Sequence, residues 1–214
     1  GSLQAELWRQ VKGDPVRFLG NASSGRQGIA LARAAALRGA RVTLVAANVS
    51  AAMPSSVEVE RVVSTGDLGE AVRAHAQHAD IIVMAAAPAD FTPVTTSAGK
   101  IKKDGESGLT LELTQTMDVL KTISHERPRE QVIVGFAAET AGSPEELLRL
   151  GREKLARKGC DLLVCNDVTG GAVFGGDRND VVIIDREAVV ATATADKNVV
   201  AHRILDAACG VLDQ

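Results

Sequence analysis

Short apolar segments that alternate with helical patterns are the feature that most constrains the fold of this chain. Three of these segments are almost wholly apolar, which is typical of strands buried on both faces of a sheet. They cover residues 80–87, 131–139 and 161–167, and a further strand is predicted over residues 41–46. Because helices separate the strands, the pattern predicts βαβ units and an α/β fold with a doubly wound, mainly parallel, Rossmann-like sheet.

Capping residues mark the expected helices. Ser143 precedes Pro144 and two glutamates, which is a typical helix start, and Asp196 stands before the last apolar periodic segment. Helices are predicted over residues 24–38, 67–78, 118–125, 143–159 and 196–212. A strand is predicted over residues 109–113, and residues 180–185 and 188–195 read as a hairpin. The 214 residues are predicted to form a single domain, with residues 1–13 as an atypical N-terminal segment.

The stretch "GNASSGRQGIALARAAALRG" (residues 20–39) has the layout of a phosphate-binding turn at a helix N-terminus. Asn21, Ser23 and Ser24 bring polar side chains to a place where free backbone N–H groups and the helix dipole favour an anion. An ordinary strand-to-helix connection is the alternative. A fold of this kind should also place a strand directly before the turn, and the preceding "SLQAELWRQVKGDPVRF" contains no convincing strand.

Two common nucleotide sites do not fit this turn. A P-loop requires Lys and Ser or Thr after its last glycine, whereas Gly25 is followed by Arg26 and Gln27. A dinucleotide site requires an acidic residue near the end of the second strand, but the first acid after the turn is Glu58. Tyrosine does not occur in the sequence, which also argues against a short-chain dehydrogenase.

Lysines are the second indication of an anion site. Five of the eight lysines lie in "KIKK" and "REKLARKG". In the second motif, Lys154 and Lys158 fall within the apolar arc of their predicted helix, although a lysine needed only for solubility should lie opposite that arc. A solvated surface cluster is the alternative. Lysines that border an apolar face suit a partly enclosed anion such as a triphosphate.

Acidic residues follow two of the predicted strands. Asp90 and Asp167 stand where an open α/β sheet binds ligands, beyond the carboxyl ends of its strands, although either could be a plain cap or turn residue. His75 and His78 share a helix face, but no nearby motif completes a metal site. We therefore assign no metal ligands and expect both histidines at the surface.

Charge and cysteine content limit the classes of partner. The net charge of −3 argues against a general nucleic-acid binder, and no apolar run approaches a membrane span. Cys160, Cys165 and Cys209 lack paired or metal-site spacing, which indicates reduced thiols. With no signal peptide before the fold, we expect a cytoplasmic protein.

Several motifs together resemble those of the bacterial phosphopantothenoylcysteine synthetase family. In chain order they are "DPVRFLGNASSGRQGIALA", "VMAAAPADF", "KIKK", "VGFAAET", "KLARKGCDLLVCNDV" and "FGGDRND", and the resemblance runs from about Asp14 to the C-terminus. Members of this family are usually the C-terminal half of a bifunctional coenzyme A biosynthesis protein. The resemblance implies a ligase in which CTP activates the carboxylate of 4′-phosphopantothenate as an acyl-cytidylate, before the amine of cysteine displaces CMP. It also implies Mg²⁺ with the nucleotide and a homodimer with a small β extension at its interface.

The resemblance also implies roles for individual residues. Asn21 matches the amide that holds the acyl-cytidylate, and Lys100 matches the mobile lysine that closes over the phosphates. Ser23, Gly25 and Gly28 match the phosphate-binding turn. The remaining nucleotide-pocket positions are Ala86, Asp90, Met117, Asp118, Val119, Leu120, Phe136, Lys154 and Lys158.

The sequence departs from the family pattern at Ala22, which is tolerable because its neighbours are kept, and in three further places. The strand and Gly-Gly-Thr turn that precede "DPVR" in the family do not occur here, Pro88 replaces an apolar residue, and "TQTMD" stands where the family usually has Asn-Pro before Asp. These departures leave two alternatives open. One is a divergent or inactive homologue that binds nucleotide or a partner, and the other is a related ligase that acts on another carboxylic acid.

Overall fold

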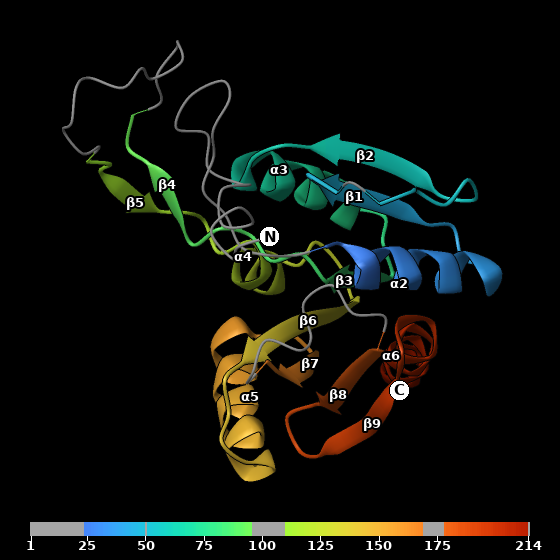
Figure 1. Ribbon diagram of the computed structural model, residues 1–214. Helices are drawn as coiled ribbons and strands as arrows, with labels where there is room; N and C mark the ends of the chain where they lie inside the picture. The colour runs from blue at the N-terminus through green and yellow to red at the C-terminus, as the bar shows by residue number, and fades with distance from the viewer. Residues whose placement is uncertain (1–23, 50, 96–109, 169–177, 214) are drawn as a thin grey trace.

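A five-stranded mixed sheet is the largest sheet of the computed structural model, which describes residues 24–49, 51–95, 110–168 and 178–213. Its strand order is β3-β6-β7-β8-β9 (Figure 1). The strands are β3 Ile81–Met84, β6 Val132–Glu139, β7 Leu162–Asp167, β8 Arg178–Ile184 and β9 Val189–Asp196. β3, β6 and β7 are paired in parallel, while β8 pairs antiparallel with both β7 and β9. The carboxyl ends of the three parallel strands therefore share one edge.

Two smaller pairs of strands complete the β structure. β1 (Thr43–Ala47) runs parallel to β2 (Glu58–Val62), and β4 (Phe91–Pro93) runs antiparallel to β5 (Leu113–Gln115). In Figure 1, β4 and β5 form a ribbon that projects from the rest of the molecule. Neither pair is hydrogen-bonded to the five-stranded sheet within the described residues.

Helices cover both faces of the main sheet, and each face has its own apolar core. The helices are α2 Arg26–Leu37, α3 Thr65–Ala76, α4 Val119–His125, α5 Pro144–Lys158 and α6 Lys197–Leu212. Side chains of α2 and α6 form one core with the sheet, and side chains of α3, α4 and α5 form the other. α5 and α6 accordingly lie on opposite sides of the strands in Figure 1.

The central strands explain why the sequence shows unbroken apolar runs. Ile133 and Val134 of β6 are fully buried on opposite faces, and so are Leu162 and Leu163 of β7. A strand covered by helices on both faces has no solvent side, so polar residues do not alternate with apolar ones.

The predicted helix caps are present. Ser143 Oγ accepts a hydrogen bond from the Glu146 N–H at 3.2 Å, and α5 ends at Gly159 in the left-handed conformation. The Asp196 carboxylate accepts hydrogen bonds from the first turn of α6. These contacts satisfy backbone groups that have no partner inside the helix.

The α/β class with a mainly parallel central sheet is confirmed, and the differences from the expected elements have local causes. β2 was not predicted because Glu58 and Glu60 interrupt its apolar pattern. The strand predicted over residues 109–113 shares only Leu113 with β5, and residue 109 lies outside the described residues. The predicted hairpin near the end of the chain exists as β8 and β9, but it extends the main sheet and is not a separate β extension.

The three cysteines are free thiols. Cys160 and Cys165 are buried between the sheet and α5, and burial raises the pKa of each thiol to about 11. Cys209 is exposed on α6. The two buried thiols therefore act as small apolar groups of the core at neutral pH.

Candidate functional site

The N-terminus of α2 lies at the carboxyl end of β3. Gly25 is the N-cap of α2, with φ of 70°, and Ser24 Oγ accepts a hydrogen bond from the Arg26 N–H at 3.4 Å. A Cβ on Gly25 would come within 2.7 Å of a Val49 methyl group, so both the backbone conformation and the space require glycine. The backbone N–H groups of this helix end are the part of the predicted turn that the structure describes. Asn21 and Ser23 lie outside the described residues.

Gly28 brings α2 against the segment that follows β3. A Cβ on Gly28 would contact the Ala85 Cβ at 3.8 Å, which is an ordinary van der Waals distance. Ala86, the next residue, is exposed. Gly28 and Ala86, both predicted to contact the nucleotide, are thus neighbours at the edge of the sheet where open α/β folds bind ligands.

Asp90 is joined by hydrogen bonds to the segment before α4. Its carbonyl oxygen accepts a hydrogen bond from the Thr116 N–H at 2.9 Å, and Thr116 is followed by Met117 and Asp118. Met117 packs over Gly69 of α3, where a Cβ would overlap its methyl group. Asp118 is the N-cap of α4 and accepts a hydrogen bond from the Lys121 N–H. The structure therefore brings these three predicted residues together.

The two predicted lysines of α5 are paired with carboxylates. Lys154 Nζ lies 2.8 Å from Glu139 Oε1, and the Lys158 ammonium donates a hydrogen bond to the Asp118 carboxylate. The lysine side chains are 23% and 19% exposed, which agrees with their place beside the apolar stripe of α5. Close packing of α5 on the sheet holds them there, because a Cβ on Gly151 would lie 2.7 Å from Cys165 Sγ.

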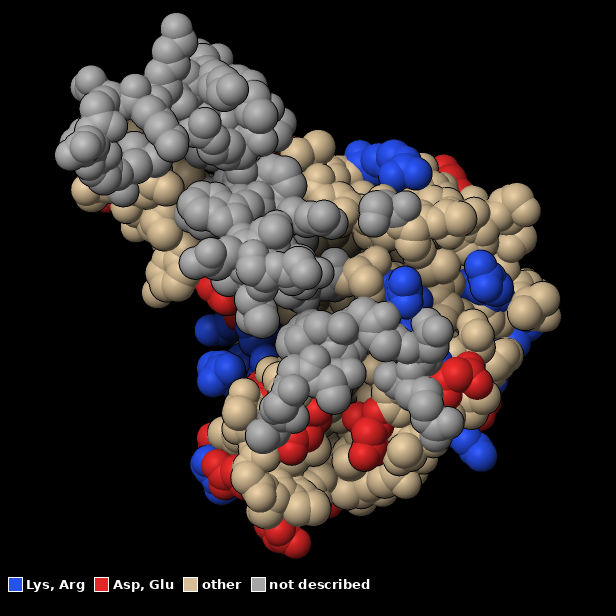
Figure 2. Space-filling model, viewed as in Figure 1, with Lys and Arg blue, Asp and Glu red and all other residues tan. Residues whose placement is uncertain are grey.

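The ion pair between Lys158 and Asp118 keeps the Asp118 carboxylate charged. Partial burial on its own raises the pKa of Asp118, but hydrogen bonds from Lys158 and the Lys121 N–H outweigh it, and the net pKa is lowered. An anion that approaches Lys158 must therefore compete with an ionised carboxylate. Figure 2 shows basic and acidic side chains lying side by side where α4 meets α5.

Three other residues predicted to line the nucleotide pocket, Val119, Leu120 and Phe136, lie apart from these contacts. Val119 and Leu120 are buried in the core beneath α4, so their side chains do not face a ligand. Phe136 lies in β6, directly after the last residue that pairs with β3. Its side chain packs with the core on the α2 face of the sheet, whereas Lys154 and Lys158 lie on the α5 face. The predicted residues thus form two groups, one on each face of the sheet. Lys100 lies outside the described residues.

Sequence reasoning missed Glu139 as a site residue. The sequence shows that Glu139 ends a buried strand, but the pairing of Glu139 with Lys154 depends on how α5 packs on the sheet. Asp167 accepts a hydrogen bond from the Ala141 N–H at 3.4 Å, which matches its alternative role in a turn.

The described part of the chain holds no group of three or more His, Cys, Asp or Glu side chains arranged to bind a metal ion. His75, at the surface, lies 2.7 Å from Glu60. No described helix has the length and apolar character needed to cross a bilayer.

Comparison with known proteins gives consistent matches over most of the chain. Residues 10–211 match the family described as the DNA/pantothenate metabolism flavoprotein C-terminal domain. The chain is 46% identical over 201 residues to the coenzyme A biosynthesis bifunctional protein CoaBC of Mycobacterium tuberculosis, covering 91% of this chain and 48% of that protein. It is 46% identical over 176 residues to the Bacillus subtilis protein of the same name, covering 81% and 42%. The chain therefore spans about half the length of these relatives.

A solved structure shows the same fold. The crystal structure of the C-terminal domain of the coenzyme A biosynthesis bifunctional protein CoaBC superposes with a TM-score of 0.76 at 32% identity. The match covers 96% of this chain and 93% of that one.

Proposed function

Because this chain belongs to the DNA/pantothenate metabolism flavoprotein C-terminal domain family, we propose that it is a CTP-dependent ligase that joins 4′-phosphopantothenate to cysteine. Its relatives are named for coenzyme A biosynthesis, and the chain covers about half of each. The observation that carries the proposal is the pair of partly buried lysines, Lys154 beside Glu139 at the end of β6 and Lys158 beside Asp118 at the start of α4. Such lysines suit the charge of a nucleotide triphosphate.

The proposed reaction has two steps. A carboxylate oxygen of 4′-phosphopantothenate attacks the α-phosphorus of CTP, and the bond to the β-phosphate breaks, so pyrophosphate leaves. The cysteine amine then attacks the acyl carbon, the bond to CMP breaks, and the amine loses a proton as the amide forms. Both steps depend on position and charge neutralisation more than on a protein nucleophile. The N-terminus of α2 supplies backbone N–H groups on one face of the sheet, and the α5 lysines supply positive charges on the other face.

The remaining parts of the proposal come from the family resemblance. Asn21 would orient the acyl-cytidylate, and Lys100 would close over the phosphates. Mg²⁺ would be held mainly by the phosphates of CTP, with few protein ligands, as is usual for this ion. Asp90 is exposed beyond β3, and its carboxylate would serve as one of these few protein ligands. We also propose a homodimer in the cytoplasm.

A pyrophosphate-release assay tests this function. With CTP and 4′-phosphopantothenate alone, we expect a burst close to one pyrophosphate per active site, because the acyl-cytidylate stays bound. Added cysteine should convert the burst into continuous release and yield the amide, which mass spectrometry detects. ATP in place of CTP should give less product. Continuous release without cysteine, or product from ATP at an equal rate, would contradict the proposal.

One observation favours a second candidate, a homologue that binds nucleotide without completing the reaction. No described strand lies between β1 and β3, although the usual doubly wound order places the first strand of the fold there. CTP binding by calorimetry with no pyrophosphate release under any condition would support this candidate over the ligase.

A further inference from the structure

The side chain of Gln27 joins the first turn of α2 to the far end of the main sheet. Gln27 Nε2 donates a hydrogen bond at 3.1 Å to the carbonyl of Lys197, the first residue of α6. Gln27 Oε1 accepts a hydrogen bond at 2.9 Å from Asn179 Nδ2 in β8. Both ends of the Gln27 amide are therefore held by residues that lie far from it in the sequence.

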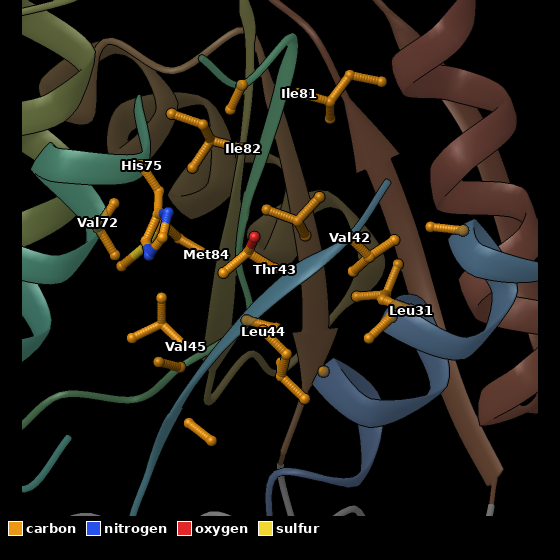
Figure 3. Close-up of a pocket in the computed structure, with 18 of the residues that line it drawn as sticks. Leu31, Val42, Thr43, Leu44, Val45, Val72, His75, Ile81, Ile82 and Met84 are labelled. Carbon is orange, nitrogen blue, oxygen red and sulfur yellow. The ribbon is translucent and has the colours of Figure 1, made fainter. Parts of the chain in front are cut away.

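The body of α2, in contrast, is held by apolar packing. The buried side chains of this helix begin at Ile29. Leu31, one turn after Gln27, is buried and points toward Val42 in a cavity lined mainly by apolar side chains (Figure 3). The first turn precedes this packing, so the contacts of Gln27 are what join it to β8 and α6.

Asn179 breaks the apolar pattern of its strand face. Alternation along β8 puts it on the same face as Val181 and Ile183, which are buried in the core beneath α2 and α6. Asn179 is only 7% exposed, and its Oδ1 has no hydrogen-bond partner among the described residues. An apolar residue of similar size would avoid the cost of this buried, unpaired oxygen. A residue that breaks a local pattern at a cost in stability is typical of a functional position.

Asn179 also lies at the end of the sheet where a ligand is expected. β8 is antiparallel to β7, with Val182 opposite Cys165, so the first residues of β8 lie beside the carboxyl end of β7. Open α/β sheets bind ligands beyond the carboxyl ends of their strands. The N–H groups in the first turn of α2, which Gln27 joins to Asn179, suit an anion at such a place.

We propose that Asn179 is a positioning residue that acts through Gln27 and fixes the direction of the first-turn N–H groups of α2 toward a bound phosphate. This role rests on the proposed ligase function, in which negative charge develops on the departing pyrophosphate. Donors that are fixed in advance stabilise charge in the transition state more than in the ground state. The link should therefore affect the rate of pyrophosphate release more than the affinity for CTP.

Asn179→Leu tests this role, because leucine is similar in size and continues the apolar face of β8. The rate constant of the pyrophosphate burst should fall about tenfold, since the donors are misaligned and not removed. The Kd for CTP should change by less than about threefold. The melting temperature should stay the same or rise, because the unpaired oxygen is gone, whereas a merely structural role would lower it.

Hydrogen exchange of one amide reports on the helix end directly. The Ile29 N–H donates to the Gly25 carbonyl at 3.0 Å and closes the first turn of α2. In Asn179→Leu this amide should exchange about tenfold faster, which is the factor that one hydrogen bond typically contributes. The amides of β6 should exchange as before.

Gln27→Met breaks the same link from its half-buried side, so the test does not depend on the folding of one variant. On its own this substitution should also slow the burst about tenfold. Because Asn179 acts through Gln27, adding Asn179→Leu to Gln27→Met should slow the burst by less than about twofold more. Thr194→Val is the control, since it removes a 2.9 Å hydrogen bond to Asp180 on the other face of the same hairpin. It should leave both the burst and the Ile29 exchange unchanged.

Three results would overturn the proposal. Additive losses in the double variant would mean that Asn179 does not act through Gln27. An unchanged burst or unchanged Ile29 exchange in a folded Asn179→Leu variant would mean that Asn179 does not position the helix end. A slower burst with a lower melting temperature and faster exchange throughout β6 would reduce Asn179 to a structural role. A parent protein without a burst contradicts the proposed function instead, and faster Ile29 exchange in Asn179→Leu would still support the link.

Discussion

Lys158→Gln should weaken CTP binding by about 10- to 100-fold, because a hydrogen bond to a charged group contributes about 1.5–3 kcal/mol. The side chain is largely shielded from solvent, where salt screens a charge less than at an exposed site. The substitution also leaves the Asp118 carboxylate without its cation, and this negative charge would repel the phosphates. Isothermal titration calorimetry with CTP and Mg²⁺ measures the change.

Arg157→Gln is the matched control. Arg157 lies next to Lys158 in the last turn of α5 but is exposed, so its loss removes the same charge from the same helix end. We expect at most a twofold change in CTP affinity, in line with the small contribution of exposed charges. Equal losses in the two variants would mean that the effect is one of net charge. Unchanged binding in a folded Lys158→Gln variant would remove Lys158 from the nucleotide site.

Gly135→Ala should lower the free energy of unfolding by about 1–3 kcal/mol, as overpacked cores typically do. A Cβ at this position in β6 would lie 2.6 Å from Leu120 Cδ2, 3.1 Å from Leu163 Cδ1 and 3.3 Å from Cys160 Sγ. Leu163 and Cys160 are fully buried, so Leu120 in the first turn of α4 is the group that must move. Movement of α4 also displaces Asp118, and we therefore expect weaker CTP binding as well.

Gly142→Ala provides the comparison for this substitution. Gly142 is exposed between β6 and α5, and a Cβ there would meet no described atom within 4 Å. Its free energy of unfolding should change by less than about 0.5 kcal/mol. Urea denaturation of both variants measures the difference. Equal stability of the two variants would show that the core beneath α4 adapts to an extra methyl group at no cost.

The fold class could be predicted from the sequence because its strongest patterns record burial on two faces. β6 and β7 are apolar except at their carboxyl ends, and α5 carries a complete set of capping residues, so their types and approximate limits were predictable. β2 could not be recognised, because pairing with β1 stabilises a segment whose own pattern is broken by Glu58 and Glu60. The place of β8 and β9 in the main sheet depends on long-range pairing, which no local pattern encodes.

The candidate site was predictable only in part, for a similar reason. The position of Lys154 and Lys158 relative to the apolar stripe of α5 follows from helical periodicity alone. Their carboxylate partners follow from tertiary packing, since Glu139 ends a strand and Asp118 begins a different helix. The roles expected of Asn21, Ser23 and Lys100 stay predictions, as these residues lie outside the described part of the chain.

The division of the apolar interior into two cores has a consequence for how this sequence can vary. Side chains of α6 contact one core and side chains of α5 the other, so substitutions in the two helices should act almost additively on stability. Either helix layer can thus diverge while the other stays unchanged. Strands β6 and β7 contribute to both cores, and a change there is tolerated only if it suits two independent sets of neighbours.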